Sequence, residues 1–214
     1  MLKSFNSNVF SAGIDLMELY QPKSENHLRK FWKSFQQLFI DIYSCKFTTI
    51  AAIEGHAPAG GCMVAMACDY RIMVDNPLGN TIGLSETKLG IVAPYWLADL
   101  MVNTIGYRQA EKALGLGLLY TPEKALDMGL IDEVISIDQD INETLYEEAM
   151  KWAKIPLLAR QKSKMLLRRK LLQNLEKNRE HDIDSFCEFV MNEHVQKSLG
   201  LYIQNLKQKK QVLK

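Results

Sequence analysis

One turn of the chain has a backbone that could hold an anion. Gly60 and Gly61 follow a predicted buried strand and a short loop, and they open an apolar helix. Glycine leaves the backbone N–H groups unobstructed by a side chain, and a helix N-terminus favours negative charge. The turn Pro58–Cys62 therefore predicts half of a site for an anion or a developing oxyanion.

A second glycine lies where an apolar strand end meets a turn. In the segment Phe10–Leu16, Ala12 and Gly13 follow the strand end, and Asp15 can cap the helical turn after it. Gly13 allows the backbone to approach a ligand closely. The segment predicts a second stretch of ligand-binding backbone.

Glu86 is the candidate acid–base group. It lies in the segment Gly83–Ile91, which otherwise holds mostly apolar and small residues, and Leu84 and Leu89 flank it. A carboxylate in such surroundings is desolvated, which raises its pKa toward neutrality and suits it to proton transfer. A single glutamate is usually a solvated surface group. We interpret this one as a proton shuttle because it occurs together with both glycine segments.

The elements that must position these residues alternate between strands and helices. Strands are predicted at 9–11, 47–53, 70–74 and 131–135, and a short strand leading into a loop at 82–90. Helices are predicted at 25–43, 60–67, 94–106, 107–116 and 122–128. From about residue 142 the chain is predicted to be helical, with breaks at Pro156 and Gly200. This order predicts an α/β core at 1–141 and a C-terminal helical region at 142–214.

The composition is that of an ordinary globular protein. Hydrophobic residues make up 47%, charged residues 24%, and the net charge is +1, which argues against disorder and against nucleic acid as the main partner. No apolar run reaches the roughly 18 residues of a membrane span. The four cysteines and four histidines have no recognisable metal-binding spacing, so neither a metal site nor a disulfide is expected.

The C-terminal region is rich in basic residues. Between Lys151 and Glu180 there are ten basic residues and two acidic ones. They form either a solvated helix face or a surface that meets phosphate groups of a ligand. The second interpretation leaves four candidates open, Lys162, Lys164, Arg168 and Arg169. His56, in the loop before the glycine turn, is interpreted as structural.

Taken together, the motifs resemble the crotonase (enoyl-CoA hydratase/isomerase) superfamily and, within it, the mitochondrial Δ3,Δ2-enoyl-CoA isomerases. The resemblance rests on FSAGIDL, AIEGHAPAGGCMVAMACDYRIMVDNP and IGLSETKLGIVAPYW, and it continues through LGLLYTPEKALDMGLIDEV to the C-terminus. It implies an α/β fold with a crotonase-like ββα spiral core, followed by a helical trimerisation region. It also implies a homotrimer in the mitochondrial matrix. The C-terminal helices are expected to pack on the core and to form the trimer interface, with Phe186, Phe189, Val190 and Leu201 buried there.

The resemblance also implies a site. The substrate would be an acyl-CoA whose thioester carbonyl accepts hydrogen bonds from the backbone amides of Ala12 and Gly60, and Glu86 matches the catalytic glutamate. Substrate contacts are expected from Ala12, Gly13, Ile14, Asp15, Leu16, Gly60 and Ser85. Coenzyme A is then part of the substrate, and no separate cofactor is expected.

Met63 decides between two reactions of this superfamily. Hydratases carry a second glutamate three positions after the oxyanion glycine, where this chain has Met63. A thioether does not activate water, whereas one carboxylate can carry a proton from C2 to C4. The sequence favours isomerisation of a cis- or trans-3-enoyl-CoA to trans-2-enoyl-CoA in fatty acid β-oxidation. The alternatives are another crotonase-type reaction, such as hydration or thioester hydrolysis, and an inactive acyl-CoA-binding or assembly subunit.

The last alternative follows from the start of the chain. Members of the superfamily carry further strands and a helix ahead of the Ser-Ala-Gly motif, whereas ten residues precede Ser11 here. We expect a core truncated at its N-terminus, with one sheet edge unpaired and part of the adenine pocket absent.

Overall fold

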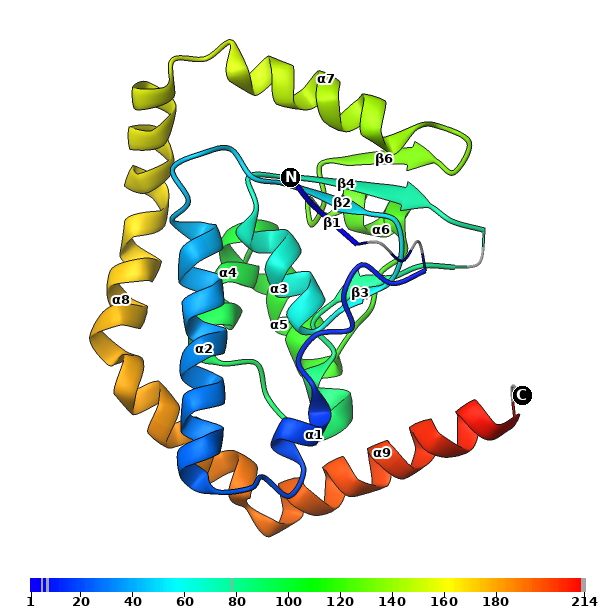
Figure 1. Ribbon diagram of the computed structural model, residues 1–214, viewed down its shortest axis with the longest axis vertical. Helices are drawn as coiled ribbons and strands as arrows, with labels where there is room; N and C mark the ends of the chain where they lie inside the picture. The colour runs from blue at the N-terminus through cyan, green and yellow to red at the C-terminus, as the bar shows by residue number, and fades with distance from the viewer. Residues whose placement is uncertain (5, 7, 78, 213–214) are drawn as a thin grey trace.

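The larger sheet of the fold has four parallel strands and lies in the upper part of the view in Figure 1. The computed structural model describes residues 1–4, 6, 8–77 and 79–212, with side chains up to residue 208. The order in the sheet is β1 (Leu2–Lys3), β2 (Ile50–Ile53), β4 (Tyr70–Asp75) and β6 (Glu133–Ser136), and all neighbours are parallel. Parallel neighbours need long crossovers. Here these crossovers contain helices, as the alternating pattern predicted.

The second strand of the sheet, β2, begins at Ile50, three residues later than predicted. Its four residues, Ile-Ala-Ala-Ile, are all buried, as expected for a central strand covered on both faces. The predicted residues 47–49 lie outside it, and the Phe47 side chain is largely exposed. The Thr49 N–H donates to the Asp69 carboxylate at 2.8 Å rather than to a strand neighbour, so the ladder starts at Ile50.

A smaller sheet brings the candidate segments together. It consists of the parallel strands β3 (Ala57–Pro58) and β5 (Ile82–Gly83). Instead of a full strand at 9–11, Val9 forms an isolated bridge with His56, and the Phe10 N–H donates to the His56 carbonyl at 2.9 Å. Because these hydrogen bonds join the first segment to β3, the Ala12 region lies beside the glycine turn.

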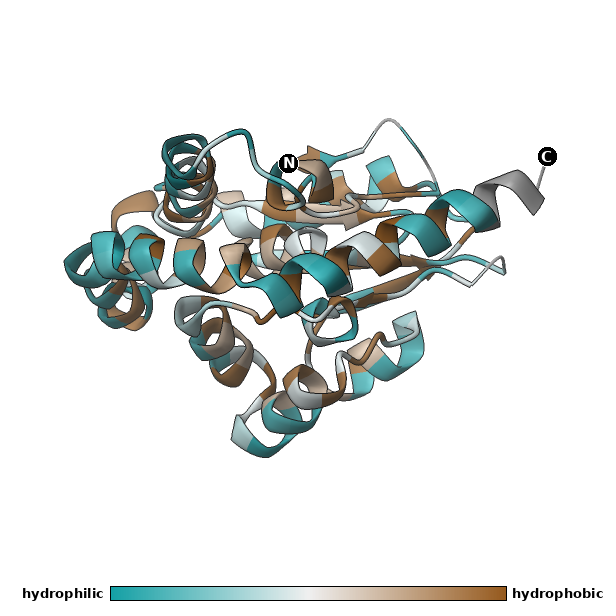
Figure 2. Cartoon of the chain, turned by 90° about the horizontal axis from the view of Figure 1, so that it is seen from below, coloured by the Kyte–Doolittle hydropathy of each residue, from teal (hydrophilic) through white to brown (hydrophobic). Residues whose placement is uncertain are grey.

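Side-chain caps mark the start of two crossover helices. In α2 (Glu25–Tyr43) the Ser24 hydroxyl accepts from the His27 N–H, and in α6 (Pro122–Asp127) the Thr121 hydroxyl accepts from the Lys124 N–H. Hydrophobic faces of the helices turn inward and hydrophilic faces outward (Figure 2). The other crossover helices are α1 (Leu16–Leu19), α3 (Gly60–Ala67), α4 (Tyr95–Ile105) and α5 (Tyr107–Leu116).

The C-terminal region is helical, with one predicted break confirmed and one wrong. It contains α7 (Ile141–Ala153), α8 (Leu157–Met191) and α9 (Glu193–Val212), and Pro156 is the N-cap of α8. The chain does not break at Gly200, which lies inside α9, but at Asn192. A Cβ at Gly200 would lie 3.0 Å from the Tyr20 ring, so this glycine serves close packing rather than helix termination.

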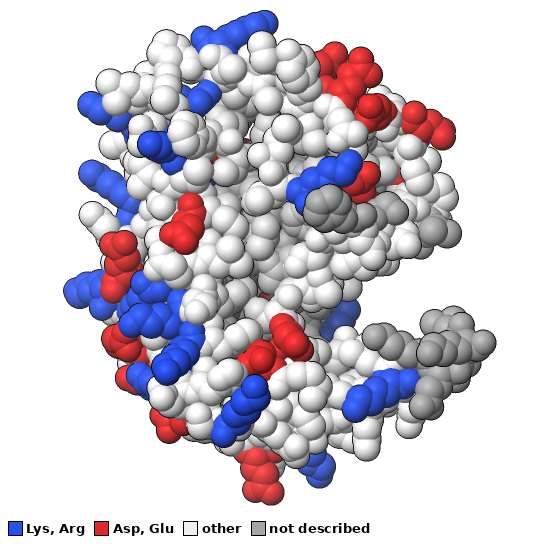
Figure 3. Space-filling view, viewed as in Figure 1, with Lys and Arg blue, Asp and Glu red and all other residues white. Residues whose placement is uncertain are grey.

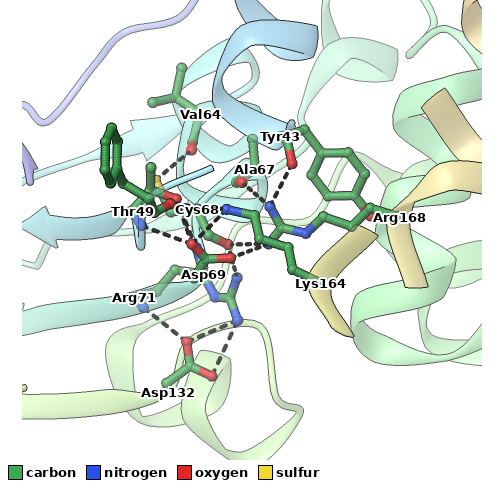
Figure 4. A network of polar contacts seen from close by, with 11 residues as sticks. Tyr43, Thr49, Val64, Ala67, Cys68, Asp69, Arg71, Asp132, Lys164 and Arg168 are labelled. Carbon is green, nitrogen blue, oxygen red and sulfur yellow. Dashed lines mark hydrogen bonds and ion pairs between the residues drawn. The ribbon is translucent and has the colours of Figure 1, made fainter. Parts of the chain in front are cut away.

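A buried charge cluster fixes α8 to the start of β4 (Figure 4). The Asp69 carboxylate lies 2.8 Å from Lys164 Nζ and 3.0 Å from Arg168 Nη2. Arg168 also donates to the carbonyls of Tyr43, Ala67 and Cys68. Burial lowers the pKa of Arg168. Lys164 and Arg168 thus have structural partners within the chain.

The described part of the chain leaves β1 at one edge of the sheet, with β2 as its single strand neighbour. None of the described helices has the length and apolar character that crossing a membrane requires.

Candidate active site

One cavity collects residues from all three segments that the sequence singles out. Predicted residues in its lining are Ala12, Ile14, Leu16, Gly60, Ser85 and Glu86. Apolar residues make up most of the remainder: Trp32, Phe35, Pro58, Ala59, Leu89, Ile91, Val92, Pro94, Leu97, Phe186 and Tyr202. A mostly apolar cavity with few polar groups is the usual form of a small-molecule site.

Gly13 and Asp15 lie just behind this cavity. They border a neighbouring hollow that shares Ile14, Phe35 and Gly60 with it. The Asp15 carboxylate accepts from the Met17 N–H at 2.9 Å and caps α1, so its polar group serves the helix. The structure brings five of the seven predicted substrate-binding residues into the cavity lining and places these two next to it.

The backbone amides of Ala12 and Gly60 are available to a ligand. Gly60 is the first residue of α3, and the first hydrogen bond of this helix runs from the Met63 N–H to the Ala59 carbonyl. The Gly60 N–H therefore has no acceptor within the helix. The Ala12 N–H makes no hydrogen bond with any of the described residues. A Cβ at Gly60 would lie 3.1 Å from the Cα of Gly13, so only glycine allows the two backbones to meet this closely.

Ala59 holds a strained backbone directly before Gly60. Its φ of 51° and ψ of −121° lie in a region that residues with a Cβ rarely adopt. The Ala59 N–H donates to the Gly83 carbonyl at 2.8 Å, which ties this conformation to β5. Such strain is typical of functional sites. No sequence signal reveals it, because alanine is not a residue that marks a positive φ.

Glu86 has the environment that its sequence predicted. It begins a 3₁₀ turn, η1 (Glu86–Leu89), and only 9% of it is exposed. Burial raises the pKa of its carboxyl group to about 7. The Oε2 atom is buried and has no hydrogen-bond partner among the described residues. The group is therefore poised to exchange a proton with a bound ligand.

Met63 does not reach this cavity. Its side chain is fully buried in the hydrophobic core, and it is absent from the described cavity lining. Among the described lining residues, Glu86 is the only one with a carboxyl group. The cavity thus offers one carboxylate rather than a pair.

Helices distant in sequence complete the cavity wall. Trp32 and Phe35 come from α2, Phe186 from α8 and Tyr202 from α9. Trp32 and Phe35 lie within the predicted helix 25–43, and Phe186 was expected to be buried in the C-terminal helices. Helical spacing identifies the apolar face but does not separate core from cavity, which is why sequence reasoning missed this role.

The other C-terminal residues that were expected to be buried fall into two groups. Val190 is buried within this chain and Phe189 is half-buried, whereas Leu201 is exposed. The burial of Val190 agrees with the expectation that the C-terminal helices pack on the core.

Basic side chains gather along the outer edge of the molecule over α8 (Figure 3). Lys162 and Arg169 are exposed there, and neither lines the cavity. His56 contacts Thr81 through Nδ1 at 3.2 Å, which agrees with its structural interpretation. The described residues contain no group of three or more His, Cys, Asp or Glu side chains arranged to hold a metal ion.

Comparisons with known proteins agree with this geometry. A model of the family "Enoyl-CoA hydratase/isomerase" matches residues 1–211. Enoyl-CoA delta isomerase 1, mitochondrial, from Rattus norvegicus is 48% identical over 98% of this chain and 72% of its own length. The Homo sapiens protein of the same name is 43% identical over 98% of this chain and 68% of its own length.

Solved structures confirm the predicted crotonase-type fold. The crystal structure of human mitochondrial delta3-delta2-enoyl-CoA isomerase has a TM-score of 0.93 at 43% identity, covering 97% of this chain and 80% of that chain. The enoyl-CoA hydratase from Bacillus halodurans has a TM-score of 0.82 at 25% identity, covering 93% of this chain and 79% of that chain.

Proposed function

We propose that this chain, which belongs to the enoyl-CoA hydratase/isomerase family, converts 3-enoyl-CoA to trans-2-enoyl-CoA in fatty acid β-oxidation. The observation that carries the proposal is a single buried carboxyl group, Glu86, in one cavity with the Ala12 and Gly60 backbones. The names of the mouse, rat and human relatives, each an enoyl-CoA delta isomerase, support the same reaction.

The two amides stabilise the intermediate. The thioester carbonyl accepts hydrogen bonds from the N–H groups of Ala12 and Gly60. When the C2 proton leaves, negative charge develops on this oxygen, and donors that are already in place stabilise it without reorganisation. Loss of one such donor typically raises the barrier by about 3 kcal/mol. The Gly13–Gly60 contact keeps both donors in position.

Glu86 moves one proton between two carbons. Its ionised carboxylate removes the proton from C2, and the electron pair enters the enolate. The protonated carboxyl group then returns a proton to C4, and the double bond lies between C2 and C3 in conjugation with the thioester. A pKa of about 7 suits both steps, because the group accepts and donates a proton with little penalty near neutral pH.

The remaining lining residues bind and orient the acyl group. Ile14, Leu16 and Ser85 border the reacting end, while Gly13 and Asp15 support the backbone of this wall. The reaction uses no metal ion and no cofactor besides the coenzyme A that the substrate carries. Met63 leaves no second carboxylate to activate water, which favours isomerisation over hydration.

The test compares two reactions of the purified wild-type chain. Formation of the conjugated thioester from 3-enoyl-CoA is followed by the rise of its ultraviolet absorbance. Water addition to trans-2-enoyl-CoA is followed by the loss of the same absorbance. We expect isomerisation to be much the faster reaction. Faster hydration would identify a hydratase instead. Binding of acyl-CoA without either reaction would identify a binding subunit.

The same family membership leads us to propose a homotrimer in the mitochondrial matrix, with residues 142–214 as the trimerisation region. Support comes from the mitochondrial relatives and from four exposed leucines of α8, Leu157, Leu158, Leu166 and Leu167. Sedimentation equilibrium should give three times the mass of the chain, and replacing Leu166 and Leu167 by glutamate should lower it. A wild-type monomer would contradict this assembly.

A further inference from the structure

An aromatic wall closes the buried end of the cavity. The rings of Trp32 and Phe186 stack at 3.5 Å between centroids, with 7° between their planes. Trp32 is 2% exposed and Leu97 1%, whereas Val92, in the same lining, is 54% exposed. An acyl chain that lies in this cavity with its thioester at Gly60 would therefore extend away from solvent toward Trp32.

Asp182 holds this wall from behind. It lies one helical turn before Phe186 on α8, and it is 7% exposed. Its Oδ2 atom accepts three hydrogen bonds, from Trp32 Nε1 at 2.8 Å, Gln36 Nε2 at 2.7 Å and Trp96 Nε1 at 3.2 Å. One carboxylate oxygen thus ties α2 and α4 to α8, the first of which lies beside α8 in Figure 1.

The donors of this group are neutral. No Lys, Arg or His of the described residues lies within ion-pair distance of Asp182. Arg179, one turn earlier, donates from Nε to Gln36 Oε1 at 3.1 Å, and it is the Gln36 side-chain amide that contacts Asp182. A buried carboxylate without a cation is costly, and an apolar side chain often gives equal or greater stability at such a position. The carboxylate therefore points to a role other than stability.

We propose that Asp182 is a positioning residue that fixes the Trp32 indole against Phe186 and thereby sets the longest acyl chain that the cavity accepts. This inference rests on the proposed function. The indole N–H bond fixes the rotation of the Trp32 ring, and the Phe186 ring stacks on the face thus presented. Without the acceptor, packing alone holds the Trp32 ring, and the end wall is less firmly fixed.

The experiment measures kcat/KM for 3-enoyl-CoA substrates of increasing chain length. Asp182→Ala and Asp182→Leu both remove the acceptor, and the second fills the space if the first fails to fold. We expect the ratio of long-chain to short-chain kcat/KM to rise by about threefold or more, since one methylene changes such ratios about tenfold or more in a fixed apolar pocket. Asp182→Asn keeps an acceptor oxygen and should retain the wild-type ratio.

Asp184→Ala is the matched control. This carboxylate lies two residues further along α8 and also joins α8 to α2, through Arg29 at 2.5 Å, but it is exposed and does not contact the aromatic wall. Its ratio should equal that of the wild type. Equal loss of activity for all chain lengths in the Ala or Leu variant would show a merely structural role and overturn the proposal.

A separate readout keeps this inference distinct from the proposed function. Quenching of tryptophan fluorescence measures binding of saturated acyl-CoAs of different lengths, without any reaction. If the wild type binds but does not isomerise, the proposed function fails, and the chain-length dependence of binding still decides the role of Asp182. An unchanged length dependence in the folded Leu variant would overturn it.

Discussion

At the scale of single residues, the burial of Glu86 dictates a pH dependence. Burial raises its pKa to about 7. Only the ionised form accepts the C2 proton, so kcat/KM should be low well below this pH, rise through it and level off above it. Initial rates measured across this pH range test the prediction, and thermal unfolding at each pH shows whether the protein stays folded. A flat profile across neutral pH would mean that another group is the base.

Ala59 supports a prediction of stability. Glycine adopts the backbone conformation of Ala59 without strain, so Ala59→Gly should raise the free energy of unfolding by about 1 kcal/mol. The gain is limited because glycine also increases the conformational entropy of the unfolded chain. Urea denaturation measures it.

The matched control reverses the sign. Ala98→Gly, inside the regular helix α4, should lower the free energy of unfolding by about 1 kcal/mol. Destabilisation by Ala59→Gly as well would show that the backbone at Ala59 carries no strain.

At the scale of elements, the Asp69 cluster joins α8 to the sheet. Truncation of the Asp69 side chain should therefore lower the free energy of unfolding strongly. Asp69→Ala leaves two buried cations, Lys164 and Arg168, without their partner. Breaking a buried pair in this way typically costs about 3–5 kcal/mol. Chemical denaturation should show this loss, and Asp127→Ala, in an exposed pair with Lys124, should cost less than about 1 kcal/mol. Similar losses in both variants would contradict the structural role of the cluster.

The element boundaries that sequence could predict are those set by local signals. The helix at Gly60–Ala67 was placed correctly because a glycine turn and an apolar run define it. The break predicted at Gly200 was wrong because that glycine faces Tyr20, far away in sequence. The late start of β2 likewise depends on a side chain, Asp69, that follows the strand by many residues. Contacts of this kind leave no local pattern.

At the scale of the whole molecule, the cavity combines segments from residue 12 to residue 202. The presence of Ala12, Gly60 and Glu86 in its lining could be predicted, since each lies in a short motif with its own chemistry. Its aromatic wall could not, because Trp32, Phe186 and Tyr202 look like ordinary apolar helix positions until tertiary packing turns them toward the cavity. The resemblance to the family identifies the three motifs and their order along the chain, and the fold brings them close together in space.

The most direct measurement of the central claim is the isomerase kcat of Glu86→Gln beside that of the wild type. Glutamine keeps the shape of the side chain but does not accept the C2 proton, so the rate with 3-enoyl-CoA should fall by about 10²–10⁴-fold. Acyl-CoA binding and thermal unfolding of the variant should show that it is folded and still binds. A folded Glu86→Gln variant with wild-type turnover would contradict the assignment of Glu86 as the proton shuttle.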